Sequence, residues 1–123
     1  MRGDVRVERK KRRGVEIPRE LQQELVRGLQ SYLERSFSGG AVAVVYPQGA
    51  SEPADNETVA RLDGQTVHDI AWQIFGRRVR GAQVAAIAWG VLGTLDYRIR
   101  EQYGLPLRKR EVTKWLWRLG QDD

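Results

Sequence analysis

The chain has 123 residues, of which 41% are hydrophobic and 30% charged, a composition typical of one globular domain. It contains no cysteine, which excludes disulfides, thiolate metal sites and cysteine nucleophiles. The formal net charge of +5 favours a polyanionic partner, of which nucleic acid is the commonest.

The first thirteen residues are strongly basic, with seven cations against Asp4 and Glu8. We predict a flexible basic tail over residues 1–14 and a single globular domain over residues 15–123. Such a tail adds phosphate affinity without sequence preference, although a merely solvated tail is the alternative. Its expected phosphate contacts are Arg9, Lys10, Lys11, Arg12 and Arg13. No apolar stretch of the kind found in secretory signals follows the tail, so we expect a cytoplasmic protein without membrane contact.

Residues 18–37 predict a helix, because leucines recur at helical spacing after Pro18 and two glycines end the pattern. Residues 41–46, AVAVVY, form a valine-rich run typical of a buried strand. An exposed loop rich in proline and polar residues then leads to a second strand over residues 57–62. We expect the two strands to pair as a small antiparallel sheet.

The segment after the second strand allows two interpretations. In one, Asp63 and Gly64 turn a hairpin; in the other, Thr66 caps a helix and Asp69 completes a capping box. Apolar residues keep helical spacing from Val67 as far as Gly76, which favours the helix.

The longest predicted helix runs from Ala82 to about Tyr103, after the basic connection GRRVRG. Its first half is apolar all round, which indicates a central position. A second face combines Ala86, Gly90, Gly93 and Tyr97, where small side chains allow close packing, either within the chain or across a homodimer interface. A final helix covers residues 108–120. The predicted fold is therefore α+β and mainly helical, with about four helices packed on the small antiparallel sheet.

Trp117 lies off the apolar stripe of the final helix, which is formed by Val112, Trp115, Leu116 and Leu119. At about 100° per residue, it points roughly 140° away from Val112, onto the face of Arg110 and Lys114. Aromatic rings among cations form a stacking platform for unpaired bases, because the cations neutralise the phosphates alongside. The alternative for Trp117 is a protein interface, where tryptophan and arginine are common hot-spot residues.

The sequence thus predicts a non-catalytic nucleic-acid-binding protein that prefers single-stranded DNA or RNA. The expected binding residues are Arg77, Arg78, Arg80, Arg100, Arg108, Lys109, Arg110 and Lys114 for the phosphates, with Trp117 and Trp72 for stacking. Two alternatives remain: a duplex DNA-binding regulator of the winged or helix-turn-helix kind, and a protein interaction subunit of a larger assembly. The helix after GRRVRG suits the reading of base edges poorly, because Gln83 is the single side chain near its start that can reach one. The final helix, which begins with Arg108, Lys109 and Arg110, is the alternative recognition helix.

We do not expect an enzyme. His68 is the only histidine and precedes Asp69, and neighbouring residues on a helix do not face each other as members of a catalytic triad must. The sequence has no HExxH motif and no glycine-rich phosphate loop. We therefore expect no catalytic residue, metal or cofactor.

Overall fold

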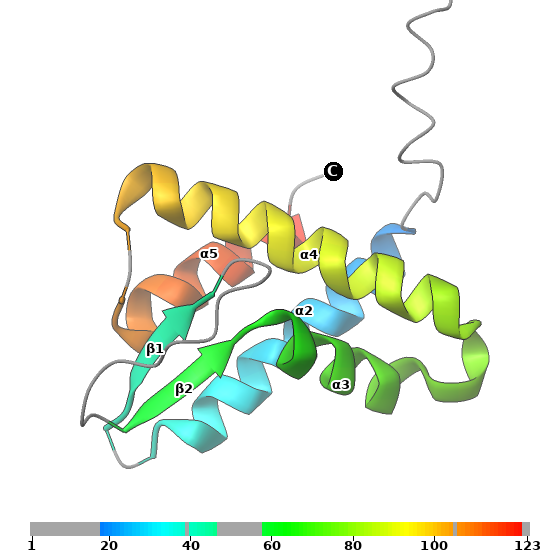
Figure 1. The fold of residues 1–123 in the computed structure, drawn as a ribbon, viewed down its shortest axis with the longest axis horizontal. Helices are drawn as coiled ribbons and strands as arrows, with labels where there is room; N and C mark the ends of the chain where they lie inside the picture. Colours follow the sequence, from blue (N-terminus) through cyan, green and yellow to red (C-terminus); the bar gives the residue numbers. More distant parts are fainter. Residues whose placement is uncertain (1–17, 39, 47–57, 105, 122–123) are drawn as a thin grey trace, which may run out of the picture.

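The computed structural model describes residues 18–38, 40–46, 58–104 and 106–121. Along these residues the elements are α2 (Arg19–Ser36), β1 (Val42–Val45), β2 (Val59–Leu62), α3 (Gly64–Phe75), η1 (Gly76–Arg78), α4 (Gly81–Gln102) and α5 (Lys109–Gln121) (Figure 1). The prediction of a mainly helical α+β fold is confirmed. The predicted basic tail, including Arg9, Lys10, Lys11, Arg12 and Arg13, lies outside the described residues.

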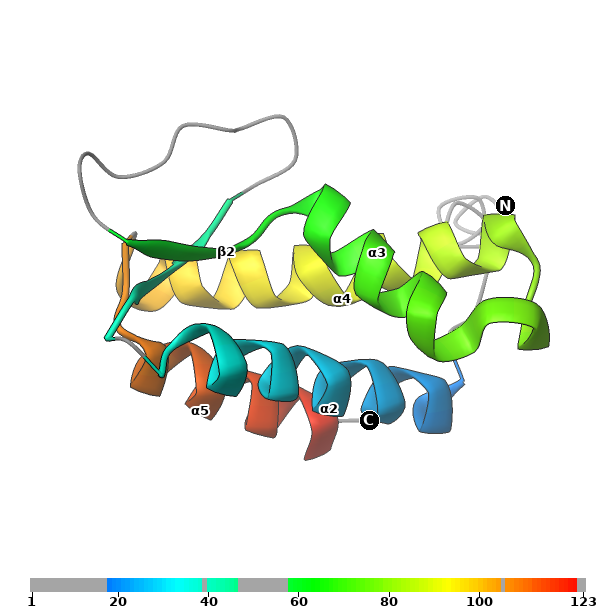
Figure 2. The same cartoon turned by 90° about the horizontal axis from the view of Figure 1, so that it is seen from below.

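The helices lie in two layers. Figure 2 shows α2 and α5 side by side in one layer, and α3 and α4 in the other, with the strands at one end of the molecule. Each helix turns its apolar stripe toward the space between the layers, where Leu25 and Leu29 of α2 are fully buried. The polar faces of α2 and α5 therefore form one continuous outer surface.

The two strands are parallel, so the predicted antiparallel sheet is wrong. Val42 pairs with Val59, and Val45 pairs with Leu62. An antiparallel pair can be joined by a tight turn, whereas a parallel pair needs a connection of about a dozen residues or more. The thirteen residues 46–58 between the strands are enough for the chain to return to the same end of the sheet.

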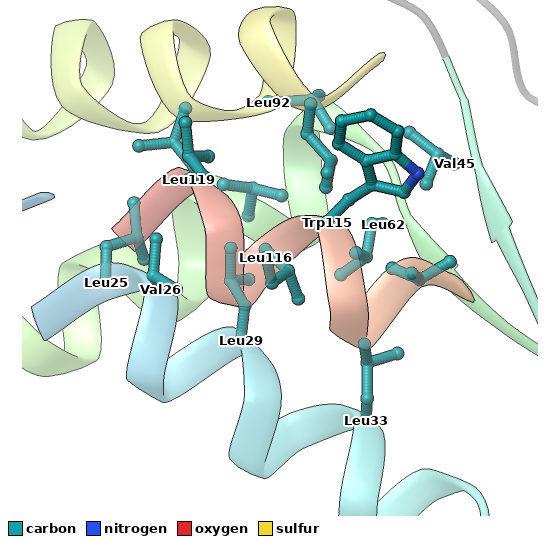
Figure 3. Packing of buried hydrophobic residues seen from close by; sticks show 14 of the residues in the cluster. Leu25, Val26, Leu29, Leu33, Val45, Leu62, Leu92, Trp115, Leu116 and Leu119 are labelled. Carbon is teal, nitrogen blue, oxygen red and sulfur yellow. The ribbon is translucent and has the colours of Figure 1, made fainter. Parts of the chain in front are cut away.

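The final helix is the amphipathic helix that the sequence predicts. Its stripe residues Val112, Trp115, Leu116 and Leu119 are all buried. Figure 3 shows Leu116 in the region of Leu29 of α2, and Trp115 in the region of Leu92 of α4 and Val45 of β1. Arg118 covers Trp115, with its guanidinium carbon 4.9 Å from the centre of the indole.

The helix predicted after the second strand is confirmed, but its predicted cap is wrong. Asp63 caps α3, because its Oδ1 accepts a hydrogen bond from the backbone N–H of Thr66 at 2.8 Å. Asp69 accepts instead from the side chain of Gln65. Asp63 precedes Gly64, and the ring of Trp89 from α4 occupies the place that a Cβ of Gly64 would need.

Candidate functional site

The end of α5 is held against the start of α2 by hydrogen bonds. The last carbonyls of a helix have no partner within it and need one from elsewhere. Here the side chains of α2 donate: Gln22 Nε2 lies 3.1 Å from the carbonyl oxygen of Leu119, and Gln23 Nε2 lies 2.7 Å from that of Gly120. Arg19 Nη2 donates to the carbonyl oxygen of Gln121 at 3.2 Å. These bonds fix how closely the two helices approach.

An ion pair joins the same two helices at their other end. Lys109 Nζ, in the first turn of α5, lies 2.9 Å from Glu34 Oε1, near the end of α2. The two helices run in opposite directions, since the start of each lies beside the end of the other. The outer surface between them is thus held at both ends.

Trp117 projects from this surface. Its side chain is 62% exposed, which confirms the prediction that it lies off the apolar stripe. The preceding tryptophan, Trp115, is 8% exposed and belongs to the core. Helical periodicity alone therefore separates a core indole from an indole that is available to a ligand.

Two hollows flank Trp117, and together we call them the Trp117 groove. Trp117 of α5 and Arg27 and Gln30 of α2 line both of them. The larger hollow, of about 620 Å³, is completed by Ser31, Glu34, Thr113 and Lys114. The smaller, of about 270 Å³, is completed by Gln23, Val26, Gly120 and Gln121. The larger hollow lies toward the start of α5 and the smaller toward its end, so the indole stands between them.

The groove is basic. Its lining contains the cations Arg27 and Lys114 and a single carboxylate, Glu34, which forms an ion pair with Lys109. Arg110 lies one turn before Lys114 on the same helix, and neither forms an ion pair with a described residue. A ligand in the groove therefore meets an excess of positive charge beside an exposed aromatic ring.

Several predicted binding residues lie in or next to the groove. Trp117 and Lys114 line it. Lys109 and Arg110 belong to the first turn of α5, and Arg108 immediately precedes this helix; Arg108 and Arg110 are exposed. The structure therefore places Trp117 and Lys114 in the groove and Lys109 beside its carboxylate Glu34.

The three arginines of the basic connection lie elsewhere, between α3 and α4. Arg78 is partly neutralised, because its Nη2 lies 2.6 Å from Glu24 Oε1 and also donates to the carbonyl of Ile74. The hydrogen bond from Arg78 holds the pKa of Glu24 below its ordinary value, against the opposing effect of desolvation. Arg77 and Arg80 are exposed and form no ion pair with the described part of the chain.

Two further predicted residues belong to the α3–α4 layer and line neither hollow. Trp72 of α3 is 50% exposed. Arg100 of α4 forms an ion pair within its own helix, with its Nε 3.1 Å from Asp96 Oδ1. The structure does not bring Trp72 and Trp117 together, so the predicted pair of stacking residues does not form one site.

Sequence reasoning missed Arg27 and Gln30, which line both hollows. They occupy the polar side of an ordinary amphipathic helix, and nothing in their spacing distinguishes them from Arg35, which lines neither hollow. What places them beside Trp117 is the packing of α2 on α5, a tertiary relationship that a single sequence does not encode in any local signal.

The second face of α4 is open to solvent at two of its predicted positions. A Cβ on Gly93 would meet no atom within 4 Å, and Tyr97 is 63% exposed. The Tyr97 hydroxyl donates to Glu101 Oε2 at 3.0 Å, and this hydrogen bond raises the pKa of Tyr97. At these two positions, therefore, the face does not pack against another part of the described chain.

Other kinds of site find little support among the described residues. His68 Nδ1 lies 3.9 Å from Asp69 Oδ1, on a partly exposed helix surface. In the described ranges no three potential metal ligands cluster, and no helix has the length and apolarity needed to cross a membrane. Comparison of the chain with protein-family models, curated proteins and solved structures finds no match.

Proposed function

We propose that the protein binds single-stranded nucleic acid, without catalysis, in the Trp117 groove. The observation that carries this proposal is the exposed indole of Trp117 between two hollows, beside Arg27 and Lys114. Stacking of an unpaired base on such a ring contributes roughly 1 to 3 kcal/mol, and adjacent cations neutralise the strand's phosphates.

An exposed apolar side chain is in itself ordinary on a protein surface. Trp117 differs because its surroundings combine the two components that single-strand binding requires, an aromatic face and positive charge. The hydrogen bonds and the ion pair between α2 and α5 support the proposal further, because they hold the groove in shape before a ligand arrives.

The packing of the helices favours a single strand over a duplex. α2 lies along α5 (Figure 2), and the exposed face of α5 carries Trp117, to which a duplex offers no unpaired base for stacking. On α4, the first turns bury Val84 and Ile87 and leave Gln83 as the polar side chain near the helix start. The start of α4 therefore presents no row of side chains suited to reading base edges.

The test is a titration with a labelled single-stranded oligonucleotide and its duplex, followed by fluorescence anisotropy at two salt concentrations. We expect tighter binding of the single strand and an affinity that falls with salt. Trp117→Ala should weaken single-strand binding by roughly 5- to 150-fold, the equivalent of one stacking contact. Trp72→Ala is the matched control, since it removes an exposed tryptophan from the other layer.

Equal losses in the two tryptophan variants would contradict the assignment to the groove. Preference for the duplex would favour the regulator interpretation instead. Binding of neither, combined with a stable dimer that Gly93→Leu dissociates, would favour an interaction subunit that uses the open face of α4.

Arg27 provides a second, electrostatic test. For single strands, each lost phosphate contact reduces the slope of log affinity against log salt by about 0.7. Arg27→Gln should show this reduction. Arg35→Gln removes the same charge from the same helix but from a position that lines neither hollow, and it should leave the slope almost unchanged.

A further inference from the structure

Because Trp117 lies between two hollows, its ring can make more than one stacking contact. The two hollows share three lining residues, and Trp117 is one of them, so both lie against this residue. The larger hollow continues along α5 to Thr113 and the smaller to Gln121. A ligand that follows the groove therefore meets the ring between two successive spaces.

Arg27 also belongs to both hollows, from the opposite helix. Its guanidinium suits the bidentate binding of a phosphate. In a strand with one base in each hollow, a phosphate joins the two bases. This phosphate lies where the two hollows meet, next to Arg27 and Trp117. The cation and the ring are thus arranged for one dinucleotide step.

We propose that Trp117 inserts between two successive bases of a single strand, with one base in each hollow and Arg27 bound to the phosphate that joins them. This inference rests on the proposed function and adds the unit that the groove recognises, which is two successive bases and the phosphate between them. Lys114, in the larger hollow, is available to the neighbouring phosphate. Gln23, in the smaller hollow, donates its amide nitrogen to the carbonyl of Gly120, which leaves its side-chain oxygen to accept a hydrogen bond.

This arrangement also gives a reason for selection against duplexes. The two bases must separate to admit the indole, which in a duplex means unstacking a paired step. In a single strand the bases part at much lower cost, and both regain a stacking partner on the ring. Preference for single strands then follows from the site itself, without any reading of base edges.

The experiment uses short deoxyribose-phosphate strands of one length whose units are abasic except at chosen positions. One strand carries a single thymine, a second carries two adjacent thymines, and a third carries two thymines separated by several abasic units. All have the same backbone charge, so differences in affinity report the bases alone. Affinities are measured by anisotropy for the unmodified protein, Trp117→Ala and the control Trp72→Ala.

We expect the adjacent pair to bind roughly 5- to 150-fold more tightly than the single thymine, the gain of a second stacking contact. The separated pair should bind like the single thymine, apart from the statistical gain of a second way to bind. Trp117→Ala should abolish the advantage of the adjacent pair, and Trp72→Ala should preserve it.

Equal affinities of the adjacent and separated pairs would overturn the inference. If ordinary single strands still bound tightly and Trp117→Ala still weakened them, the proposed function would stand with one stacked base alone. Failure of every single strand to bind would remove the proposed function as well.

Discussion

Lys109 Nζ lies 2.9 Å from Glu34 Oε1, so a cation predicted to contact phosphate is already bound to a carboxylate of the facing helix. Glu34 also lines the larger hollow. This carboxylate therefore opposes an anionic ligand in two ways, by its own charge and by occupying Lys109.

Glu34→Gln should consequently tighten the binding of a single strand, by roughly three- to tenfold at low salt, because it removes the repulsion and releases Lys109. The effect should fade as salt is raised. Since both side chains are partly exposed, the loss of the pair should change the free energy of unfolding by no more than about 1 kcal/mol. Anisotropy and urea denaturation measure the two quantities.

The control for Glu34→Gln is Asp96→Asn, which changes the net charge equally and releases Arg100 in the other layer. A comparable gain in affinity from this control would show that overall charge, and not the Trp117 groove, governs binding.

The two tryptophans of α5 should respond differently to truncation. Trp115→Ala removes a buried ring from the core and should lower the free energy of unfolding by roughly 3 to 5 kcal/mol. Trp117→Ala removes an exposed ring and should leave stability almost unchanged. Urea denaturation with a far-UV signal compares them, and similar losses in the two variants would contradict their placement in core and groove.

Gly64 and Gly93 offer a matched pair of substitutions. A Cβ on Gly64 would overlap the ring of Trp89, so Gly64→Ala should destabilise the fold by roughly 1 to 3 kcal/mol through overpacking. A Cβ on Gly93 meets open space within a helix. Gly93→Ala should therefore stabilise the monomer by about 0.5 to 1 kcal/mol. Opposite shifts of the thermal midpoint are the expected result.

The cap of α3 should make stability depend on pH. Burial raises the pKa of Asp63, but hydrogen bonds from Thr66 and the charge of Arg61 outweigh it, so the pKa lies below its ordinary value. A folded-state pKa below the unfolded one means that ionised Asp63 stabilises the fold above about pH 4, the unfolded value. This contribution is lost as the pH falls through the lower folded-state pKa.

Asp63→Ala should therefore cost about 1 kcal/mol at neutral pH, and the difference from the unmodified protein should shrink in acid. Denaturation across pH 2 to 7 follows the difference. Asp69→Ala removes an exposed carboxylate of the same helix that does not cap it, and a matching pH dependence there would exclude the cap as the cause.

The sequence predicted those features that depend on helical periodicity. The distinction between Trp115 and Trp117 needs only the angle between successive residues, and the structure agrees with it. The groove needs more, because Arg27 reaches Trp117 only through the packing of α2 on α5. No pattern within α2 specifies which flank of that helix α5 will cover.

The direction of the strands was missed for a related reason. Their composition predicts two strands and their burial, but parallel and antiparallel pairing differ in the path of the connecting segment, which the strands do not specify. At Asp63 the error was local. Both Asp63 and Thr66 are good caps, and the helix begins early enough to use the first.

Parallel pairing of β1 with β2 also constrains the order in which the chain can fold. A hairpin forms from contacts between neighbours, whereas Val42 must meet Val59 across an intervening loop before any ladder hydrogen bond is gained. Strands of four residues form few such hydrogen bonds. Ala43 and Val45 become stable only against side chains of the helices, with which they share the core. We expect the sheet to form late, on helices that have already packed.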